Sequence, residues 1–211
     1  RRSPDQQRTE AAAVALALPP HKAGEIVYSN LSYTIAGAAI ERITGTPYES
    51  ALLDELLAPL GVTSAGFGPP PAIWGHRPRV QAGSLCVGRG EPQDPGAIHS
   101  DNPPLITPAG RLHLTLRDWA TVQRLFLDGA GLLTRPTIDR LLEVPANGTI
   151  SMGWAPTRGI GGVRAGMQGS NGAWAAAAMM SADTRRVAMA ITNDGRTRLL
   201  RATAHLAAEL T

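Results

Sequence analysis

The chain has 211 residues, of which 43% are hydrophobic and 18% are charged. This balance allows a sizeable apolar core and argues against a disordered chain. The net charge of +3 is small for this length, and no block of five Lys or Arg residues occurs, so no nucleic-acid surface is expected. No apolar run reaches the roughly 18 residues that span a bilayer, and a single cysteine excludes an internal disulfide.

The first part of the chain carries two helical patterns. Residues 1–18 are charged first and then rich in Ala and Leu, which predicts a helix. Apolar residues recur at helical spacing over 31–43 and predict a second one. Ser29 or Asn30 is suited to cap this second helix at its start, and Gly45 is suited to end it.

The next segments are a predicted helix and a predicted excursion. The sequence TPYE at 46–49 has the pattern of a capping box, with Thr46 at the N-cap, Pro47 at the first helical position and Glu49 at the third. Residues 66–110 are rich in Gly and Pro and lack periodicity, so we expect a long irregular loop there.

The remaining segments predict helices and then strands. Residues 115–129 and 135–143 have helical patterns, and Thr115 is suited to cap the first of them. After residue 150, short apolar runs separated by turn residues indicate antiparallel strands, and 196–210 has the apolar spacing of a closing helix. The expected fold class is α+β: a mainly helical lobe over 1–150, followed over 151–211 by antiparallel strands and the C-terminal helix.

The stretch YSN at 28–30 raises the question of function. Judged from its residue types, Tyr28 is a packed aromatic residue and Asn30 is a helix cap. The wider segment 28–68, however, closely resembles the region around the Tyr-x-Asn motif of the serine β-lactamase and penicillin-binding-protein-like family. Three later stretches resemble the same family in the expected order, at 101–122, 152–156 and 169–195.

The resemblance implies a β-lactamase/transpeptidase-like fold, with an antiparallel sheet flanked by helices, and acyl transfer on an ester, amide or β-lactam. In that family a Ser-x-x-Lys serine attacks the carbonyl and a tyrosine moves protons. By motif position, Tyr28 is the catalytic tyrosine and Asn30 orients the lysine and the substrate amide. Gly169, Ser170 and Asn171 lie on the strand that borders the acyl pocket. The partner implied is a small-molecule or short-peptide acyl substrate, and no cofactor is implied.

The sequence departs from the family pattern at two points. It contains no Ser-x-x-Lys, because Lys22 is its only lysine and Pro19 stands three residues before it. The same count excludes Lys-Thr-Gly, and the alternative His-x-Gly is replaced by Met167-Gln168-Gly169. A thioether carries no charge and donates no proton, so Met167 predicts weakened or altered catalysis. We therefore expect the nucleophile to lie in a missing N-terminal part or in a partner chain, which would leave this chain with an exposed sheet edge.

Several alternatives stay open at this point. The chain is either part of a serine hydrolase, a catalytically inactive relative that binds ligands or proteins, or an unrelated α+β domain. The stretch QGSNG resembles a nucleophile elbow around Ser170, but its strand-turn context does not fit one. Three histidines, His76, His99 and His113, lack the spacing of metal ligands, so no metal is expected, and His113 is expected to be a hydrogen-bonded structural residue. The sequence defines neither the substrate nor the cellular compartment.

Overall fold

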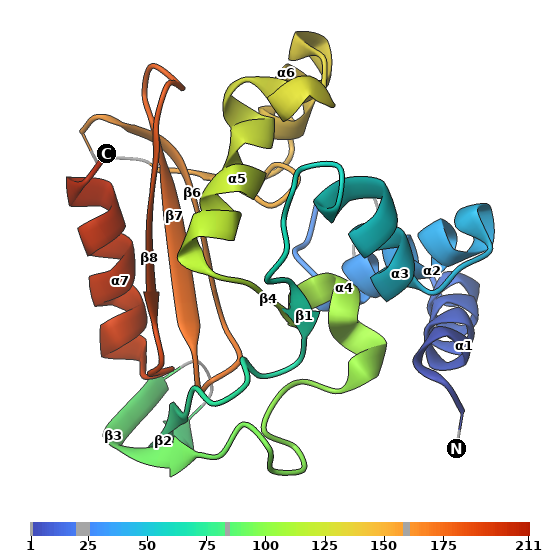
Figure 1. Ribbon diagram of the computed structural model, residues 1–211, viewed down its shortest axis with the longest axis horizontal. Coiled ribbons are helices and arrows are strands. Elements are labelled where there is room, and N and C mark those ends of the chain that lie inside the picture. Colours follow the sequence, from blue (N-terminus) through green and yellow to red (C-terminus); the bar gives the residue numbers. More distant parts are fainter. Residues whose placement is uncertain (1, 20–25, 83–84, 158–160) are drawn as a thin grey trace.

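The computed structural model describes residues 2–19, 26–82, 85–157 and 161–211 (Figure 1). Helices and antiparallel strands share the chain, as the α+β prediction requires. The helical elements are α1 (Pro4–Ala17), α2 (Asn30–Thr44), α3 (Tyr48–Leu52), η1 (Leu53–Leu57), η2 (Pro104–Ile106), α4 (Thr107–Gly110), α5 (Leu116–Leu127), η3 (Gly129–Gly131), α6 (Arg135–Leu142) and α7 (Thr197–Glu209). The strands are β1 (Gly66–Phe67), β2 (Gly75–Ala82), β3 (Leu85–Gln93), β4 (Leu112–His113), β5 (Ala155–Pro156), β6 (Val163–Ser170), β7 (Ala175–Ser181) and β8 (Val187–Thr192).

The predicted boundaries of α2 are confirmed. Ser29 is its N-cap, and the Ser29 hydroxyl accepts a hydrogen bond from the Leu31 backbone N–H at 3.2 Å. Gly45 ends the helix in the left-handed conformation, with φ of 70°, which glycine adopts without steric cost. Helices α1 and α2 pack together on the side of the molecule that is farthest from the C-terminus (Figure 1).

The capping box predicted at 46–49 is wrong. Pro47 is the N-cap of α3 and makes no side-chain cap, and the first N–H of the helix, that of Tyr48, donates instead to Glu41 Oε1 at 2.9 Å. The Glu49 carboxylate instead accepts hydrogen bonds from Arg8, at 3.0 and 2.8 Å. Glu49 thus forms a long-range ion pair with Arg8 in place of the predicted local cap. After α3 the helix continues as a π-helical turn, η1.

The long irregular loop predicted for 66–110 is also wrong in its central part. Strands β2 and β3 form an antiparallel hairpin there, in which Gly75 is opposite Gln93. Proline and glycine in both strands hide the alternating pattern that would identify a hairpin in the sequence. Residues 94–103, after the hairpin, do lack regular structure.

The predicted meander after residue 150 is confirmed. Strands β5, β6, β7 and β8 form a four-stranded antiparallel sheet in chain order, and α7 packs against it. Among the described strands, β8 has β7 as its one neighbour, so its other edge is open. The pairing of β5 with β6 reaches only Gly166, so the outer edge of β6 from Met167 to Ser170 is also unpaired by any described strand.

The sheet has an apolar cluster on each face (Figure 1). On one face, helices α5 and α6 cover Ala165, Ala178 and Met180, and Trp154 is buried there with an exposure of 1%. On the other face, α7 lies against Ala177, Met179 and Ala190 through its buried Ala207. The four alanines that begin β7 are small, so helices on either face can approach the sheet closely.

No helix in the described ranges is both long enough and apolar enough to cross a bilayer.

Candidate active site

Tyr28 and Asn30 form a hydrogen-bonded pair at the start of α2. The Tyr28 hydroxyl donates to Asn30 Oδ1 at 3.1 Å. Tyr28 is 61% exposed, so it is not the packed aromatic residue that its type alone predicts. Asn30 is the first residue of α2, and Ser29 is the cap, so the Asn30 side chain is free from a capping role. An exposed phenol and an amide are therefore held together where a ligand can reach both.

A second tyrosine supports this pair from within α2. The rings of Tyr28 and Tyr33 are 6.3 Å apart, centroid to centroid, at an angle of 54°. Burial raises the pKa of the Tyr33 phenol, and the neighbouring Tyr28 raises it further. Tyr33 thus remains a neutral hydroxyl at physiological pH and helps to fix the ring of Tyr28.

The end of β6 offers an open surface. A side chain placed at Gly169 would meet no atom within 4 Å, so there is free space beside the strand. The backbone of residues 167–170 has an unpaired outer edge among the described strands. A strand edge with free N–H and C=O groups can hold an amide or ester group by backbone hydrogen bonds.

Ser170 and Asn171 use their side chains within the turn that follows β6. The Ser170 hydroxyl donates to the Trp174 carbonyl at 2.8 Å and accepts from the Gly172 N–H at 3.0 Å. Asn171 Oδ1 accepts from the backbone N–H groups of Ala173 and Trp174, each at 3.0 Å. The Ser170 oxygen is thus engaged in a turn and is not presented as an activated nucleophile.

Met167 lies against a buried amide. The Gln123 side chain, on α5, has an exposure of 3%, and its Nε2 is 4.0 Å from the Met167 sulfur. No hydrogen-bond partner for Gln123 Oε1 lies within the described residues. Two neutral groups, a thioether and an amide, therefore lie together where α5 meets β6.

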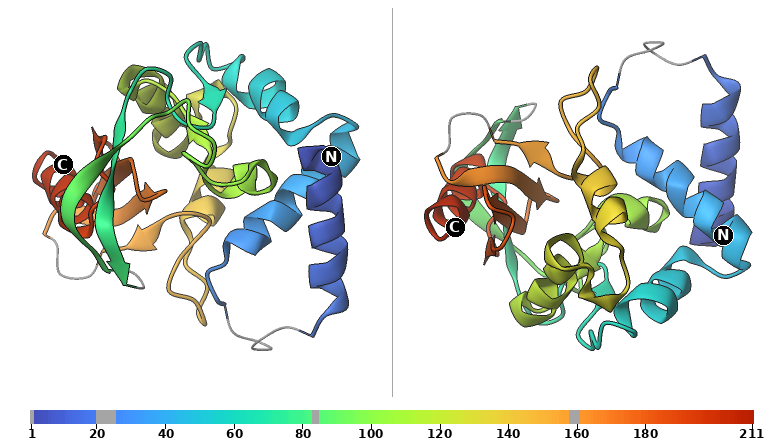
Figure 2. Two further views of the ribbon diagram at one scale, coloured as in Figure 1. Left: turned by 90° about the horizontal axis from the view of Figure 1, so that it is seen from below. Right: turned by 90° about the horizontal axis from the view of Figure 1, so that it is seen from above.

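The structure brings these predicted residues together in two groups. Tyr28 and Asn30 form one, and Met167 to Asn171 form the other. No hydrogen bond within the described ranges joins the groups. The loop that leads into β5 lies between the start of α2 and the sheet in both views of Figure 2. Ile26 lies against Gly148 in this loop, which places the segment before Tyr28 beside it.

Two residues near these groups were missed as site residues by the sequence interpretation. Asp101 reaches the β6–β7 turn, where its Oδ1 accepts from Asn171 Nδ2 at 2.7 Å. In the sequence Asp101 begins the stretch 101–122 that resembles the family, but that resemblance gave it no role. Gln123 occupies an inward position of an amphipathic helix, and a polar residue at such a position was the available signal.

The predicted histidine His113 is confirmed as a hydrogen-bonded structural residue, since its Nδ1 is 2.9 Å from the Gly68 carbonyl oxygen. His76 Nδ1 is 3.0 Å from the Asn193 carbonyl oxygen. Within the described part of the chain, no three His, Cys, Asp or Glu side chains are grouped as a metal site would require.

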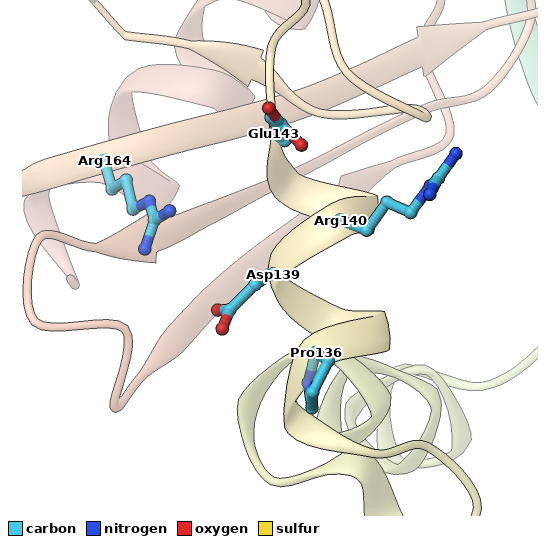
Figure 3. Close-up of a pocket in the computed structure, with 5 residues that line it drawn as sticks. All are labelled: Pro136, Asp139, Arg140, Glu143 and Arg164. Atoms are coloured by element: carbon cyan, nitrogen blue, oxygen red, sulfur yellow. The ribbon is translucent and has the colours of Figure 1, made fainter.

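Two surface depressions lie outside these groups, although Gln123, which contacts Met167, lines the second. One, of about 550 Å³, is lined by Pro136, Asp139, Arg140, Glu143 and Arg164. Figure 3 shows Asp139 and Arg164 pointing into the space between α6 and β6, whereas Arg140 points away. Asp139 is paired with Arg135 at 2.8 Å and is more than half exposed, so this is a solvated charged surface. The other, of about 580 Å³, runs between α5 and the open edge of β8.

Comparison with known families identifies the class of protein. Residues 2–211 match the family described as Beta-lactamase, so the chain belongs to the Beta-lactamase family. A search of curated proteins gave no significant match.

Solved structures support the same fold. An octameric penicillin-binding protein homologue from Pyrococcus abyssi aligns with a TM-score of 0.68 at 20% identity, over 99% of this chain and 48% of that chain. A D-stereospecific amidohydrolase from Streptomyces sp. has a TM-score of 0.61 at 22% identity, over 90% of this chain and 58% of that one. A D-amino acid amidase from Ochrobactrum anthropi, solved with L-phenylalanine amide, has a TM-score of 0.63 at 22% identity, over 81% of this chain and 51% of that one. The chain thus spans about half the length of these proteins.

Proposed function

We propose that this chain forms the tyrosine and strand side of a serine hydrolase that works through an acyl-enzyme, and that the nucleophilic serine lies in a part of the protein outside this sequence. The exposed Tyr28–Asn30 pair at the start of α2 is the observation that carries the proposal. Its support is membership of the Beta-lactamase family and the half-length alignment with penicillin-binding-protein and amidase structures.

In the proposed reaction, Tyr28 moves the proton of the nucleophile. A serine hydroxyl attacks a carbonyl well only when a neighbouring base takes its proton. A phenol has an ordinary pKa near 10, so it acts as that base when a cation beside it stabilises the phenolate. In the structure, Asn30 Oδ1 accepts a hydrogen bond from the Tyr28 hydroxyl and so orients it.

The strand β6 holds the other side of the acyl group. Its unpaired edge from residue 167 to 170 offers backbone donors to the carbonyl oxygen, and the open space at Gly169 leaves room for the substrate. The proposed substrate is an amide or ester of a small molecule or short peptide. Because Met167 and Gln123 are both neutral, this side of the pocket gives no charge pairing to a substrate carboxylate.

A second candidate is an inactive relative that retains the pocket for binding. Met167 favours it, since a thioether cannot take part in proton transfer. Covalent labelling separates the two candidates. The natural full-length polypeptide is incubated with a fluorescent penicillin and with p-nitrophenyl butyrate, and its intact mass is measured. An adduct that disappears in a Tyr28→Phe variant supports the hydrolase, whereas reversible binding without an adduct supports the inactive relative.

The Met167→His substitution tests the role assigned to the strand. The imidazole would stand beside Gln123 Oε1, which has no hydrogen-bond partner among the described residues and can accept the imidazole N–H. We expect a higher kcat for p-nitrophenyl butyrate hydrolysis than in the unmodified protein. Met167→Leu, which changes packing but adds no donor, serves as the control. An unchanged or lower rate in Met167→His would show that residue 167 does not face the reacting group.

A further inference from the structure

Asp101 connects the irregular segment after β3 to the strand that borders the proposed site. Its side chain has an exposure of 4%. Asp101 Oδ1 accepts from Asn171 Nδ2 and from the Asn102 N–H, both at 2.7 Å, and Oδ2 accepts from Arg111 Nε at 3.4 Å. A buried carboxylate is costly unless it is paired, and these three donors provide the pairing.

Asn171 passes this contact on to the backbone. Its Oδ1 is held by the N–H groups of Ala173 and Trp174, so its Nδ2 must point the other way, toward Asp101. The reverse orientation of the amide would bring its oxygen against the carboxylate. A carboxylate, an amide and two backbone N–H groups thus form one continuous hydrogen-bonded chain.

This hydrogen-bond network fixes the end of β6. Ser170 is bonded to Trp174 and Gly172 in the same turn, and Gly169, with open space beside it, precedes them directly. The segment just before Asp101 is also anchored, because Arg77 Nη2 donates to the carbonyls of His99 at 3.3 Å and Ser100 at 3.1 Å. The segment that holds Asp101 therefore has a defined position relative to the hairpin and to the strand.

We propose that Asp101 is a positioning residue, which acts through Asn171 to set the geometry of β6 at residues 169–170 for the acyl group. The inference rests on the proposed function and deepens it. Asp101 touches no substrate in this scheme. Its effect is on the placement of the strand edge, where a displacement of about 1 Å can reduce a rate about 100-fold.

The test exchanges the two partners. Asn171→Asp places two carboxylates against each other, and Asp101→Asn removes the negative charge opposite Arg111. The double variant with both substitutions restores one amide and one carboxylate, with the carboxylate now accepting the N–H groups of Ala173 and Trp174. Asp139→Asn is the control, because it also neutralises a carboxylate paired with an arginine, but on the solvated surface of α6.

Two readouts are made on the natural full-length polypeptide. The first is the NMR shift of the Trp174 backbone amide after ¹⁵N-tryptophan labelling, which gives few signals because the sequence has four tryptophans. The second is kcat and KM for p-nitrophenyl butyrate. We expect Asn171→Asp to move the Trp174 amide signal and to lower kcat about 100-fold with a smaller change in KM. The double variant should recover most of both, and Asp139→Asn should change neither.

An unmoved Trp174 signal in Asp101→Asn would overturn the positioning role, because Asn171 bonds the Trp174 N–H directly and its own substitution moves that signal in either case. A double variant that folds but is no better than Asn171→Asp would overturn it too. If even the unmodified protein fails to hydrolyse the ester, the proposed function fails, while the Trp174 signal still decides whether Asp101 positions the turn.

Discussion

The helical lobe around α1–α3 and the sheet with α5–α7 are stabilised in different ways. In the helical lobe the fully buried Arg8 side chain lies between Glu41 and Glu49, and Arg8 also donates to the Pro104 carbonyl. In the sheet, apolar side chains such as Trp154 are buried on both faces. A charge network is specific in geometry but depends on every partner, whereas an apolar core tolerates small changes.

The surfaces of the two regions also differ, in the kind of group that each leaves exposed. The helical lobe exposes many large apolar side chains, namely Val14, Leu16, Leu18, Val27, Leu31 and Ile43, each with an exposure of at least 45%. The described residues thus leave these large apolar side chains uncovered. In the sheet region, the open edge of β8 is the corresponding feature. The helical lobe should therefore respond most strongly to the loss of one polar contact.

The largest effect is expected for Arg8→Ala. It leaves two carboxylates, Glu41 and Glu49, partly buried without their cation, and removing one partner of a buried ion pair costs about 3–5 kcal/mol. Hydrogen exchange should show loss of protection in α1–α3 while β6–β8 remain protected. Arg2→Ala is the control, because the Arg2–Glu10 pair is exposed and contributes little. Equal loss of protection in both regions would show that they unfold as one unit.

Ala178→Leu tests the packing of the sheet. Ala178 is fully buried between Met167 and Met189 on neighbouring strands, in the cluster covered by α5 and α6. Extra methylene groups in such a site force shifts that cost about 1–3 kcal/mol. Denaturant unfolding of this variant and of Ala188→Leu, at the half-buried edge strand, should show the larger loss for residue 178. Similar losses would mean that the face under α5 is loosely packed.

Local sequence patterns predicted the elements of the sheet region better than the contacts of the helical lobe and the β2–β3 hairpin. The α5, α6 and α7 helices and the β6–β8 meander were predicted because apolar periodicity and turn residues are local signals. The β2–β3 hairpin was missed because its pairing does not depend on an alternating pattern. The failure at Glu49 has a different cause: its partner Arg8 is 41 residues away, and no local pattern reports such a contact.

The candidate site was predicted in the same uneven way. Family motifs identified Tyr28, Asn30 and the strand from Met167 to Asn171, and the Tyr28–Asn30 hydrogen bond agrees with that pairing. Their assigned roles stay predictions. Asp101 could not be identified from the sequence, because its importance depends on a contact with Asn171, 70 residues later, that only the folded chain creates.

Acid should weaken the polar contacts before the apolar core. Burial raises the pKa of Glu49, but the hydrogen bonds and charge of Arg8, with the Glu49 backbone and Thr107 hydrogen bonds, together leave this pKa below its ordinary value. The Ser64 hydroxyl and the N–H groups of Ser64 and Thr63 lower the pKa of Asp118 below 3.8. Both carboxyl groups are therefore more acidic in the folded state than in the unfolded state.

The sign of the effect follows from these shifts. Stability from a carboxyl group with a lowered pKa is present above the unfolded value and is lost as the pH falls through the folded value. We expect constant stability above about pH 5 and a decline from about pH 4.5 downward. Ser64→Ala and Asp118→Asn should both make the acid decline shallower, measured by thermal unfolding from pH 6 to 2.5. Identical acid curves for both variants and the unmodified protein would remove Asp118 from this account.

The smallest effect is expected for Gln123→Leu, in the sheet region. Gln123 is the polar exception under α5: its Oε1 is buried with no partner among the described residues, and its Nε2 has only the weak contact with the Met167 sulfur. Removing an unsatisfied buried polar group should stabilise the fold by about 1 kcal/mol. The urea midpoint should therefore rise without a change in the m value, whereas Gln123→Glu, which buries a charge, should lower it. If Gln123→Leu instead destabilises the full-length polypeptide, then a donor from outside this sequence reaches Oε1. Under the proposed function, that result would place the part of the protein that carries the nucleophile against α5 and beside Met167.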